Sequence, residues 1–377
     1  MRVPLHRAAV LAAVALCAAT ACTLRSLPDP QQRCETATTL GAVWSCIDAI
    51  PRTPRVESGF RSTMRVSTDF RVRMRNQSQR SACFTNPPKG FERITVESTE
   101  APLDAFYRAP DPGKPTIIVV HGIFDSRANR FMRVAMRRLA SSGYGVLAPD
   151  MRWHGCLYKD ELPATLGILE AADLQRWSSW LRTTHGATDV GLLGFSLGAL
   201  DVIHAVSSKG AAEAFRAGAI AVSPPAHLEQ VLRRLDTLPT FSQDGRNLVI
   251  RKAMRRFLAT RLRNAKIAWT DGALFSAYLG DLASRNLVGS TTAEILERAE
   301  PLLRLQNVQV PTLVLVAKND PLFGELVSNA YAGSEPRELV HVIETSTGGH
   351  IGQMGEQPQW FSSVTTSFFD AVLRVAR

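Results

Sequence analysis

Short apolar runs alternate with helical stretches along the chain from residue 91 onward. Strands are expected at 91–98, 102–108, 116–120, 145–149, 189–194, 217–223, 311–317 and 338–344. Helices are expected between or after them, at 128–141, 165–184, 197–208, 323–332 and 358–375. Short apolar strands that alternate with helices are typical of a parallel sheet covered on both faces. The pattern therefore predicts an α/β fold with a mostly parallel central sheet, which has an antiparallel start.

The alternation is interrupted between about residues 225 and 305, where the sequence is helical. Because this insert follows a strand end, we expect it to lie over the carboxyl edge of the sheet as a lid. We interpret the basic stretch RKAMRRFLATRLRNAK within it as a lid helix that packs inward, with contact to a membrane surface as the alternative. The apolar face of that helix consists of Met254, Phe257, Leu258 and Leu262.

The first 21 residues have the character of an export signal peptide. They carry Arg2 and Arg7, no acidic residue, and an apolar run that is too short to span a bilayer. The junction ATAC gives an Ala-x-Ala cleavage site and also resembles a bacterial lipoprotein box, in which Cys22 is the lipidated residue. We therefore expect a protein of the bacterial cell envelope, anchored by a lipid on Cys22 and facing the periplasm. Release without a lipid and an uncleaved anchor are the alternatives.

The segment after the signal is rich in Pro, Thr and Arg and has little periodicity. We interpret residues 22–60 as a tether followed by an irregular segment, and residues 61–377 as the main domain with its insert. That domain is expected to open with a strand at 64–75, in which apolar and basic residues alternate. Its basic face consists of Arg65, Arg71, Arg73 and Arg75.

The formal net charge of the chain is +10. The simplest interpretation of the arginine face is a solvated outer side of an antiparallel strand, and a surface for anionic lipid or substrate is the alternative. No nucleic-acid-binding motif accompanies the charge, and the export signal takes the chain out of the cytoplasm. We therefore expect no nucleic-acid partner.

Cysteine usage agrees with export. If Cys17 leaves with the signal and Cys22 is lipidated, four cysteines remain, namely Cys34, Cys46, Cys83 and Cys156. An oxidising compartment allows two disulfides among them. We expect Cys34 to pair with Cys46 and Cys83 with Cys156, although other pairings and free buried thiols stay open. No CxxC pair or HExxH motif occurs, so we expect neither a metal nor a cofactor.

The stretch GLLGFSLGAL at 191–200 contains a serine that is a candidate catalytic nucleophile. In it Ser196 stands between Gly194 and Gly198, directly after an apolar strand and directly before a helix. This strand, turn and helix are the setting of a nucleophile elbow, in which a strained turn presents a serine at the sheet edge. A helix N-cap serine is the structural alternative, but it does not explain both glycines.

A serine hydroxyl needs a base within hydrogen-bond reach and an acid that orients the base. Asp320 follows the strand at 311–317, and His350 follows the strand at 338–344 in a glycine-rich segment. The order Ser, Asp, His with each residue beyond a strand end is the order that the nucleophile elbow requires. We therefore predict Ser196, Asp320 and His350 as catalytic residues. Glu325 and Glu344 are weaker substitutes for the acid.

Catalysis also needs donors for the oxyanion of the tetrahedral intermediate. We expect one to be the backbone N–H of Leu197, next to the nucleophile. The other is expected in the loop after the strand at 116–120, where Ile123 is the first choice and Phe124 the second. We assign no chemistry to His121.

The motifs VVHGIF, PDMRWHG, GFSLG, VAKNDPL and GGHIG together resemble those of the α/β-hydrolase superfamily. The resemblance covers about 91–375 and implies the α/β-hydrolase fold with helices on both faces of the sheet. GFSLG, NDPLF and GGHIG look most like the YheT-like hydrolases, a branch associated with esterase and lipid-hydrolase activity. The chain departs from that branch in its export signal and its arginine-rich front segment, so the cellular roles of those relatives are not transferred.

These features predict a serine hydrolase that cleaves carboxylic esters through an acyl-enzyme, without a metal or cofactor. The substrate is expected to be a small-molecule or lipid ester, and the sequence does not indicate an oligomeric state. A thioesterase, amidase or peptidase would use the same residues, and a non-catalytic envelope lipoprotein on a hydrolase fold is a further alternative.

Overall fold

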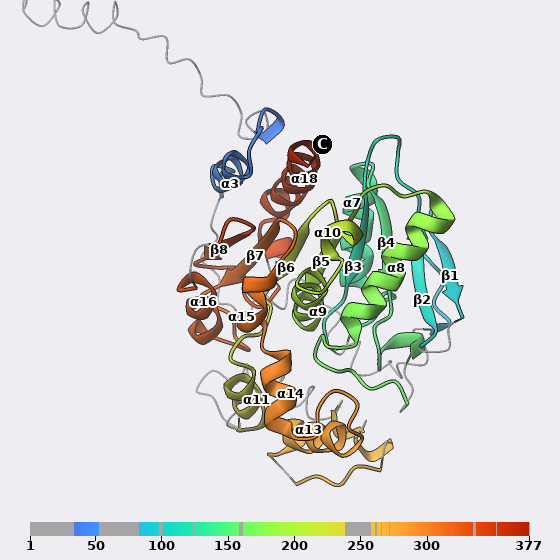
Figure 1. Cartoon of the computed structure of the whole chain (residues 1–377), viewed down its shortest axis with the longest axis vertical. Helices are drawn as coiled ribbons and strands as arrows, with labels where there is room; N and C mark the ends of the chain where they lie inside the picture. Colours follow the sequence, from blue (N-terminus) through green and yellow to red (C-terminus); the bar gives the residue numbers. More distant parts are fainter. Residues whose placement is uncertain are drawn as a thin grey trace, which may run out of the picture.

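The computed structural model describes residues 34–52, 83–97, 101–157, 161–237 and 258–376, with short breaks at 124, 261, 265, 271, 335–336 and 352. An eight-stranded sheet forms the centre of the molecule, in the order β1-β2-β4-β3-β5-β6-β7-β8, and helices lie on both sides of it (Figure 1). The predicted α/β-hydrolase fold with a mostly parallel sheet is confirmed.

The strands lie within a few residues of the apolar runs that predicted them. They are β1 (Glu92–Val96), β2 (Leu103–Arg108), β3 (Thr116–Val120), β4 (Gly145–Pro149), β5 (Val190–Phe195), β6 (Ala219–Val222), β7 (Thr312–Ala317) and β8 (Val340–Thr345). β2 pairs antiparallel with both β1 and β4, and every other pair in the sheet is parallel. The carboxyl ends of the parallel strands therefore share one edge, where a ligand site is expected.

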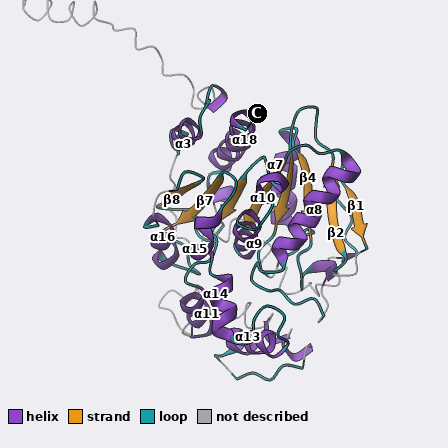
Figure 2. Ribbon diagram, in the orientation of Figure 1, coloured by secondary structure: helices purple, strands orange, loops and turns teal. Residues whose placement is uncertain are grey.

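Helices cover each face of the sheet because alternate strand residues point to opposite faces (Figure 2). Ile117 and Val119 pack with the helices α7 (Arg130–Ser141) and α18 (Pro358–Val375). Ile118 and Val120 pack with the helices of the other face. Those helices are α8 (Glu170–His185), α9 (Leu197–Val206) and α16 (Glu325–Ala332). The short elements are η1 (Gly155–Leu157), α10 (Ala211–Ala214), η2 (Leu305–Asn307) and α17 (Gln353–Glu356).

The described part of the insert after β6 is largely helical, as predicted, and lies at the lower end of the view in Figure 1. Its helices are α11 (Leu228–Thr237), α13 (Leu274–Ser284), α14 (Thr292–Ala299) and α15 (Pro301–Arg304). The carboxylate of Glu300 accepts hydrogen bonds from the backbone N–H groups of His227 and Leu228, which joins the two ends of the insert. Asp236 accepts bonds from the N–H groups of Phe275 and Ser276 and so joins α11 to α13. Hydrogen bonds therefore join the two ends of the insert and also connect two of its helices.

Of the segment 22–60, which was expected to be a tether and an irregular segment, residues 34–52 are described and contain a helix, so the expectation was wrong for that part. They contain the helix α3 (Leu40–Asp48), whose first turn is capped by the Thr39 hydroxyl, which accepts from Ala42 N–H at 3.2 Å. A disulfide joins Cys34 to Cys46 across this segment, and a second joins Cys83 to Cys156. Both predicted pairings are confirmed, and paired cysteines of this kind are typical of exported proteins.

Helix α8 begins at Glu170, five residues later than the periodicity predicted. The buried Glu170 carboxylate accepts hydrogen bonds from Thr165 N–H, the Thr165 hydroxyl and Gly167 N–H, at 2.6 to 3.0 Å. These bonds hold residues 165–169 in a turn, in which Leu166 has a φ of 56° and Gly167 a φ of 92°. Positive φ angles are incompatible with a helix. The hydrogen bonds of Glu170 therefore delay the start of the helix, although the apolar pattern begins at residue 165.

Several predictions from the sequence lie outside the described residues. They concern the signal at 1–21, Cys22, the arginine-rich strand at 64–75, Phe124, and the first part of the basic stretch in the insert. Among the residues that are described, no helix is both long enough and apolar enough to cross a membrane.

His204 on α9 links the sheet layer to the insert and gives the fold a pH dependence. Its Nε2–H donates to the Ala299 carbonyl at 2.9 Å, and burial lowers the pKa of His204 to about 4. The unfolded chain has a histidine pKa of about 6.5, so the folded state is fully favoured above that pH and loses stability as the pH falls toward 4. We expect wild type to lose about 2 kcal/mol more than His204→Gln between pH 7 and pH 4.5. Urea unfolding of both proteins at the two pH values measures this, and equal losses would contradict it.

Candidate active site

Ser196 lies at the turn that joins β5 to α9. Its backbone has φ 55° and ψ −116°, and its N–H donates to the Val222 carbonyl at 2.8 Å. A non-glycine residue with such a φ is strained, and strain of this kind is found where a fold must present a reactive side chain. The turn places Ser196 at the carboxyl edge of the sheet and at the N-terminus of α9, where the helix dipole favours negative charge.

The glycines around Ser196 are required by close backbone approaches. A Cβ on Gly194 would lie 2.2 Å from the Gly198 carbonyl oxygen, and a Cβ on Gly198 would lie 2.4 Å from the His121 carbonyl oxygen. Neither backbone atom can move aside without disturbing β3 or α9. The sharp turn therefore demands glycine at both positions, and a simple helix cap would not.

Ser196, His350 and Asp320 form one hydrogen-bonded chain. The Ser196 hydroxyl lies 2.8 Å from His350 Nε2, and His350 Nδ1 lies 2.8 Å from Asp320 Oδ2. Because a carboxylate only accepts, the imidazole donates from Nδ1 and its Nε2 is free to accept the hydroxyl proton. All three side chains are nearly buried. The arrangement can remove a proton from Ser196 as its oxygen attacks a carbonyl carbon.

The backbone around Asp320 fixes its carboxylate. Oδ1 accepts from the N–H groups of Leu322 and Phe323 at 2.8 and 3.1 Å, which leaves Oδ2 directed at His350. The Phe323 ring stands edge-on to the imidazole with the centroids 4.7 Å apart. Two constraints therefore define the position of His350, one polar and one apolar.

Ile123 and Leu197 carry the two backbone N–H groups that were expected to bind an oxyanion, and Gly122 lies against Ser196, since a Cβ on it would be 3.2 Å from the Ser196 Cβ. Within the part of the chain that is described, neither of them has a hydrogen-bond acceptor. The Gly122 carbonyl, which shares a peptide plane with Ile123 N–H, accepts from Asp125 N–H at 3.2 Å and from the His121 ring at 2.9 Å. Since the peptide unit is planar, holding its carbonyl also fixes the direction of the Ile123 N–H. Two oriented donors beside a nucleophile can bind an oxyanion.

A model of the alpha/beta hydrolase family matches residues 117–364, which contain all of these residues. The chain belongs to the alpha/beta hydrolase family. No curated protein matches this hydrolase in sequence. An esterase structure from Pyrococcus furiosus superposes with a TM-score of 0.51 and 21% identity, over 74% of this chain and 89% of the esterase. The structure of 2,6-dihydroxy-pseudo-oxynicotine hydrolase superposes with a TM-score of 0.53 and 15% identity, over 91% and 86% of the two chains. At these identities the likeness concerns the fold.

Two residues of this alpha/beta hydrolase support the site although neither was predicted to take part in its chemistry. His121 accepts from Met151 N–H on Nε2 at 3.0 Å, so its proton lies on Nδ1 and is donated to the Gly122 carbonyl. Asn319 accepts from Gly349 N–H at 2.8 Å and ties the Asp320 loop to the His350 loop. Asn319 directly precedes Asp320 and His121 lies two residues before Ile123, and this closeness in sequence is the signal that could have identified them.

Glu325 and Glu344, the weaker candidates for the acid, make other contacts. Glu344 forms an ion pair with Lys318 at 2.9 Å, and Glu325 begins the helix α16. Neither carboxylate is bonded to His350. Among the described residues, no group of three or more His, Cys, Asp or Glu side chains is placed to hold a metal ion.

Apolar side chains pack around Leu197, the residue that follows Ser196. Leu197 packs in one cluster with Leu200, Leu228 and Ala299. The half-buried residues that pack against this cluster are Ile123, Leu166, Ile168 and Leu296. They come from three separate segments, the proposed oxyanion loop, the turn before α8 and α14 of the insert. Leu197, directly after Ser196, is therefore bordered by carbon surface that is only partly covered.

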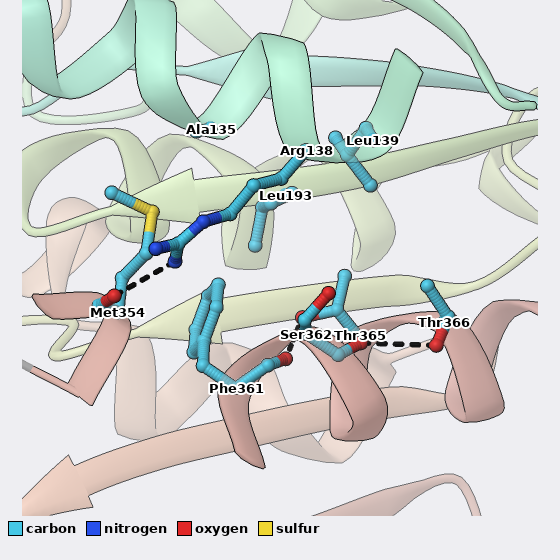
Figure 3. A pocket seen from close by; sticks show the side chains of 9 residues that line it. All are labelled: Ala135, Arg138, Leu139, Leu193, Met354, Phe361, Ser362, Thr365 and Thr366. Carbon is cyan, nitrogen blue, oxygen red and sulfur yellow. Dashed lines mark hydrogen bonds between the residues drawn. The ribbon is translucent and has the colours of Figure 1, made fainter. Parts of the chain in front are cut away.

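A small hollow lies behind the His350 loop, between α7 and α18 (Figure 3). Its wall is almost entirely carbon, and its residues are Ala135, Arg138, Leu139, Leu193, Met354, Phe361, Ser362, Thr365 and Thr366. The Arg138 guanidinium donates to the Met354 carbonyl at 2.8 Å, and burial lowers the pKa of Arg138. The hollow thus belongs to the packing that supports α17, the turn that follows His350.

Proposed function

We propose that this hydrolase cleaves carboxylic esters with Ser196 as nucleophile, His350 as base and Asp320 as the acid that orients the base. The single observation that carries the proposal is the continuous hydrogen-bonded chain from the Ser196 hydroxyl through His350 to Asp320, on a strained turn. In support, an esterase from Pyrococcus furiosus is among the solved structures that share the fold.

The proposed reaction has two halves. Ser196 Oγ attacks the ester carbonyl carbon while its proton passes to His350 Nε2, and the resulting oxyanion is bound by the N–H groups of Ile123 and Leu197. When the intermediate collapses, the ester C–O bond breaks and the alcohol leaves with the proton from His350. Water then attacks the acyl-serine, again through His350, and releases the carboxylic acid and free Ser196.

The half-buried apolar surface beside Ser196 favours an ester with an apolar acyl group. Ile123, Leu166 and Leu296 lie against Leu197, whose N–H is one of the proposed oxyanion donors. Covering such surface with an acyl chain is favourable by about 0.8 kcal/mol per buried methylene. The insert that contributes Leu296 would then act as the lid over this chain.

Leu166 provides a test of the acyl side. It already has a left-handed backbone, which asparagine tolerates, so Leu166→Asn removes the apolar contact without adding backbone strain. We expect kcat/KM for p-nitrophenyl octanoate to fall about tenfold relative to p-nitrophenyl acetate, because part of a leucine's transfer free energy is lost. Leu303→Asn, at a leucine that is 50% exposed on α15, is the matched control and should leave the ratio unchanged. An unchanged ratio in Leu166→Asn would place the acyl group elsewhere.

The ester assignment is tested by substrate and probe together. Purified protein should react with a fluorophosphonate probe, and peptide mass spectrometry should locate the adduct on Ser196. A matched series of an ester, a thioester and an amide with the same acyl group should be turned over in that order of kcat/KM. A preference for the thioester or amide would select one of the alternative hydrolases, and absence of labelling would favour a non-catalytic role.

We further propose that the chain is exported and held at the bacterial cell envelope by a lipid on Cys22. The two disulfides support export, since such cross-links persist in oxidising compartments. A lipid anchor would place the apolar acyl site close to membrane esters. Metabolic labelling with an alkyne fatty acid, lost in Cys22→Ala, tests the anchor.

A further inference from the structure

The loop that carries Ile123 is held at both ends by one short segment of the chain. At one end, Met151 N–H donates to His121 Nε2 at 3.0 Å. At the other end, Asp150 Oδ1 accepts from Arg127 N–H at 3.0 Å. Asp150 and Met151 are neighbours, so they bracket the loop from His121 to Arg127. The position of this pair therefore determines where the Ile123 N–H lies.

Arg127 is fully buried and links Asp150 to β2. Its guanidinium forms ion pairs of 2.5 Å with Asp150 and with Asp104, and both carboxylates are themselves buried. Buried carboxylates are unfavourable unless they are paired, and a planar guanidinium can serve both of them at once. Arg127 thus pairs with one carboxylate near the start of β2 and one just after β4, and holds the two at a defined separation.

The Cys83–Cys156 disulfide completes the same cluster. Cys156 N–H donates to Asp150 Oδ2 at 2.9 Å, and Arg127 Nη2 lies 3.2 Å from Cys156 Sγ. On the far side, Arg93 contacts both sulfur atoms at 3.3 Å and donates to Asp104 at 2.6 Å. The hydrogen bond to Asp104 raises the pKa of Arg93. The disulfide therefore lies between two guanidinium groups that share the Asp104 carboxylate.

We propose that Arg127 and the Cys83–Cys156 disulfide are a positioning device for the oxyanion loop. The disulfide fixes Cys156, and Cys156 and Arg127 together fix the Asp150 carboxylate. Asp150 and Met151 in turn hold the loop that presents Ile123 N–H to the reacting carbonyl. This inference rests on the proposed function in assigning Ile123 N–H to the oxyanion. The physical link between the disulfide and residues 121–127 does not depend on that assignment.

A displaced oxyanion loop should affect kcat more than KM. An oxyanion donor acts in the transition state, so a displaced Ile123 N–H lowers kcat while substrate binding is little affected. Arg127→Lys keeps the charge but not the fork that serves two carboxylates, and Cys83→Ser/Cys156→Ser removes the covalent link. The pair Cys34→Ser/Cys46→Ser is the matched control, because that disulfide lies in the α3 segment beside β8, at the other edge of the sheet from β1 and β2.

The test compares these three variants with wild type on p-nitrophenyl butyrate. We expect kcat to fall at least tenfold in Arg127→Lys and in the Cys83/Cys156 variant, with KM within about threefold, because small displacements of a catalytic group have effects of this size. The Cys34/Cys46 variant should keep kcat within twofold even if its melting temperature falls. A folded test variant that keeps wild-type kcat overturns the proposal, and so does an equal loss of kcat in the control pair.

Hydrogen–deuterium exchange supplies a readout that needs no turnover. In both test variants the amides of residues 121–127 and 150–157 should exchange at least tenfold faster than in wild type, while the control leaves them unchanged. Unchanged exchange in the test variants overturns the proposed link. If wild type has no esterase activity, the proposed function fails, and the exchange experiment still decides whether the disulfide holds this loop.

Discussion

Ser196→Ala is expected to lower kcat for ester hydrolysis by about four to six orders of magnitude. The variant removes the atom that attacks the carbonyl, while His350, Asp320 and the backbone donors stay in place. A slow residual reaction from bound water is expected, because oxyanion binding alone retains some catalysis. The measurement is kcat on p-nitrophenyl butyrate, together with loss of fluorophosphonate labelling.

Ser223 offers a matched control for this variant. It is also buried, also has a positive φ of 50°, and follows the neighbouring strand β6. Its hydroxyl has no hydrogen-bond partner among the described residues, and so has no base to activate it. Ser223→Ala should keep wild-type kcat and labelling. A Ser196→Ala protein that is folded yet hydrolyses esters at the wild-type rate would refute the proposed function.

Asp320→Asn is expected to lower kcat by about 10⁴-fold with little change in KM. An asparagine side chain has a single carbonyl oxygen, but the site requires acceptors in two directions, toward His350 and toward the N–H groups of Leu322 and Phe323. If the oxygen serves the two N–H groups, the amide nitrogen faces His350 Nδ1 and forces the other tautomer. His350 can then no longer accept the proton of Ser196.

The pH profile and a second carboxylate variant complete this test. In Asp320→Asn the remaining activity should rise with hydroxide concentration, since hydroxide can replace the lost base. Glu344→Gln removes the carboxylate that pairs with Lys318, and should keep kcat within twofold. A large loss in Glu344→Gln with a small loss in Asp320→Asn would show that the acid had been assigned to the wrong residue.

Periodicity and strand ends were sufficient to predict the sheet, the insert and the positions of the three site residues. Parallel strands align their carboxyl ends. Asp320 and His350 could therefore be expected to meet Ser196, although they lie 124 and 154 positions away from it in the sequence. The direct contact between His350 and Ser196 agrees with that reasoning. Patterns of this kind work where one rule, such as alternation of apolar residues, decides the local structure.

Prediction from the sequence failed where a buried polar group determines the local structure. Glu170 looks like an interior residue of a helix that begins at 165, yet the helix begins only at Glu170, whose three hydrogen bonds hold Leu166 in the preceding turn. The link from Arg127 to Asp104 and Asp150 was invisible for the same reason. These partners are distant in sequence, and their pairing depends on a tertiary structure that periodicity does not encode.

The helix α3 has a consequence for the solubility of the protein. β8 is the last strand of the sheet, and an open strand edge is a template on which another chain can pair. Trp44 donates to the Glu338 carbonyl at 3.2 Å and stacks on His341 at 5.0 Å, while Asp48 is bonded to His341. The Cys34–Cys46 cross-link keeps this short helix in place beside β8. The α3 segment thereby protects the sheet against edge-to-edge aggregation.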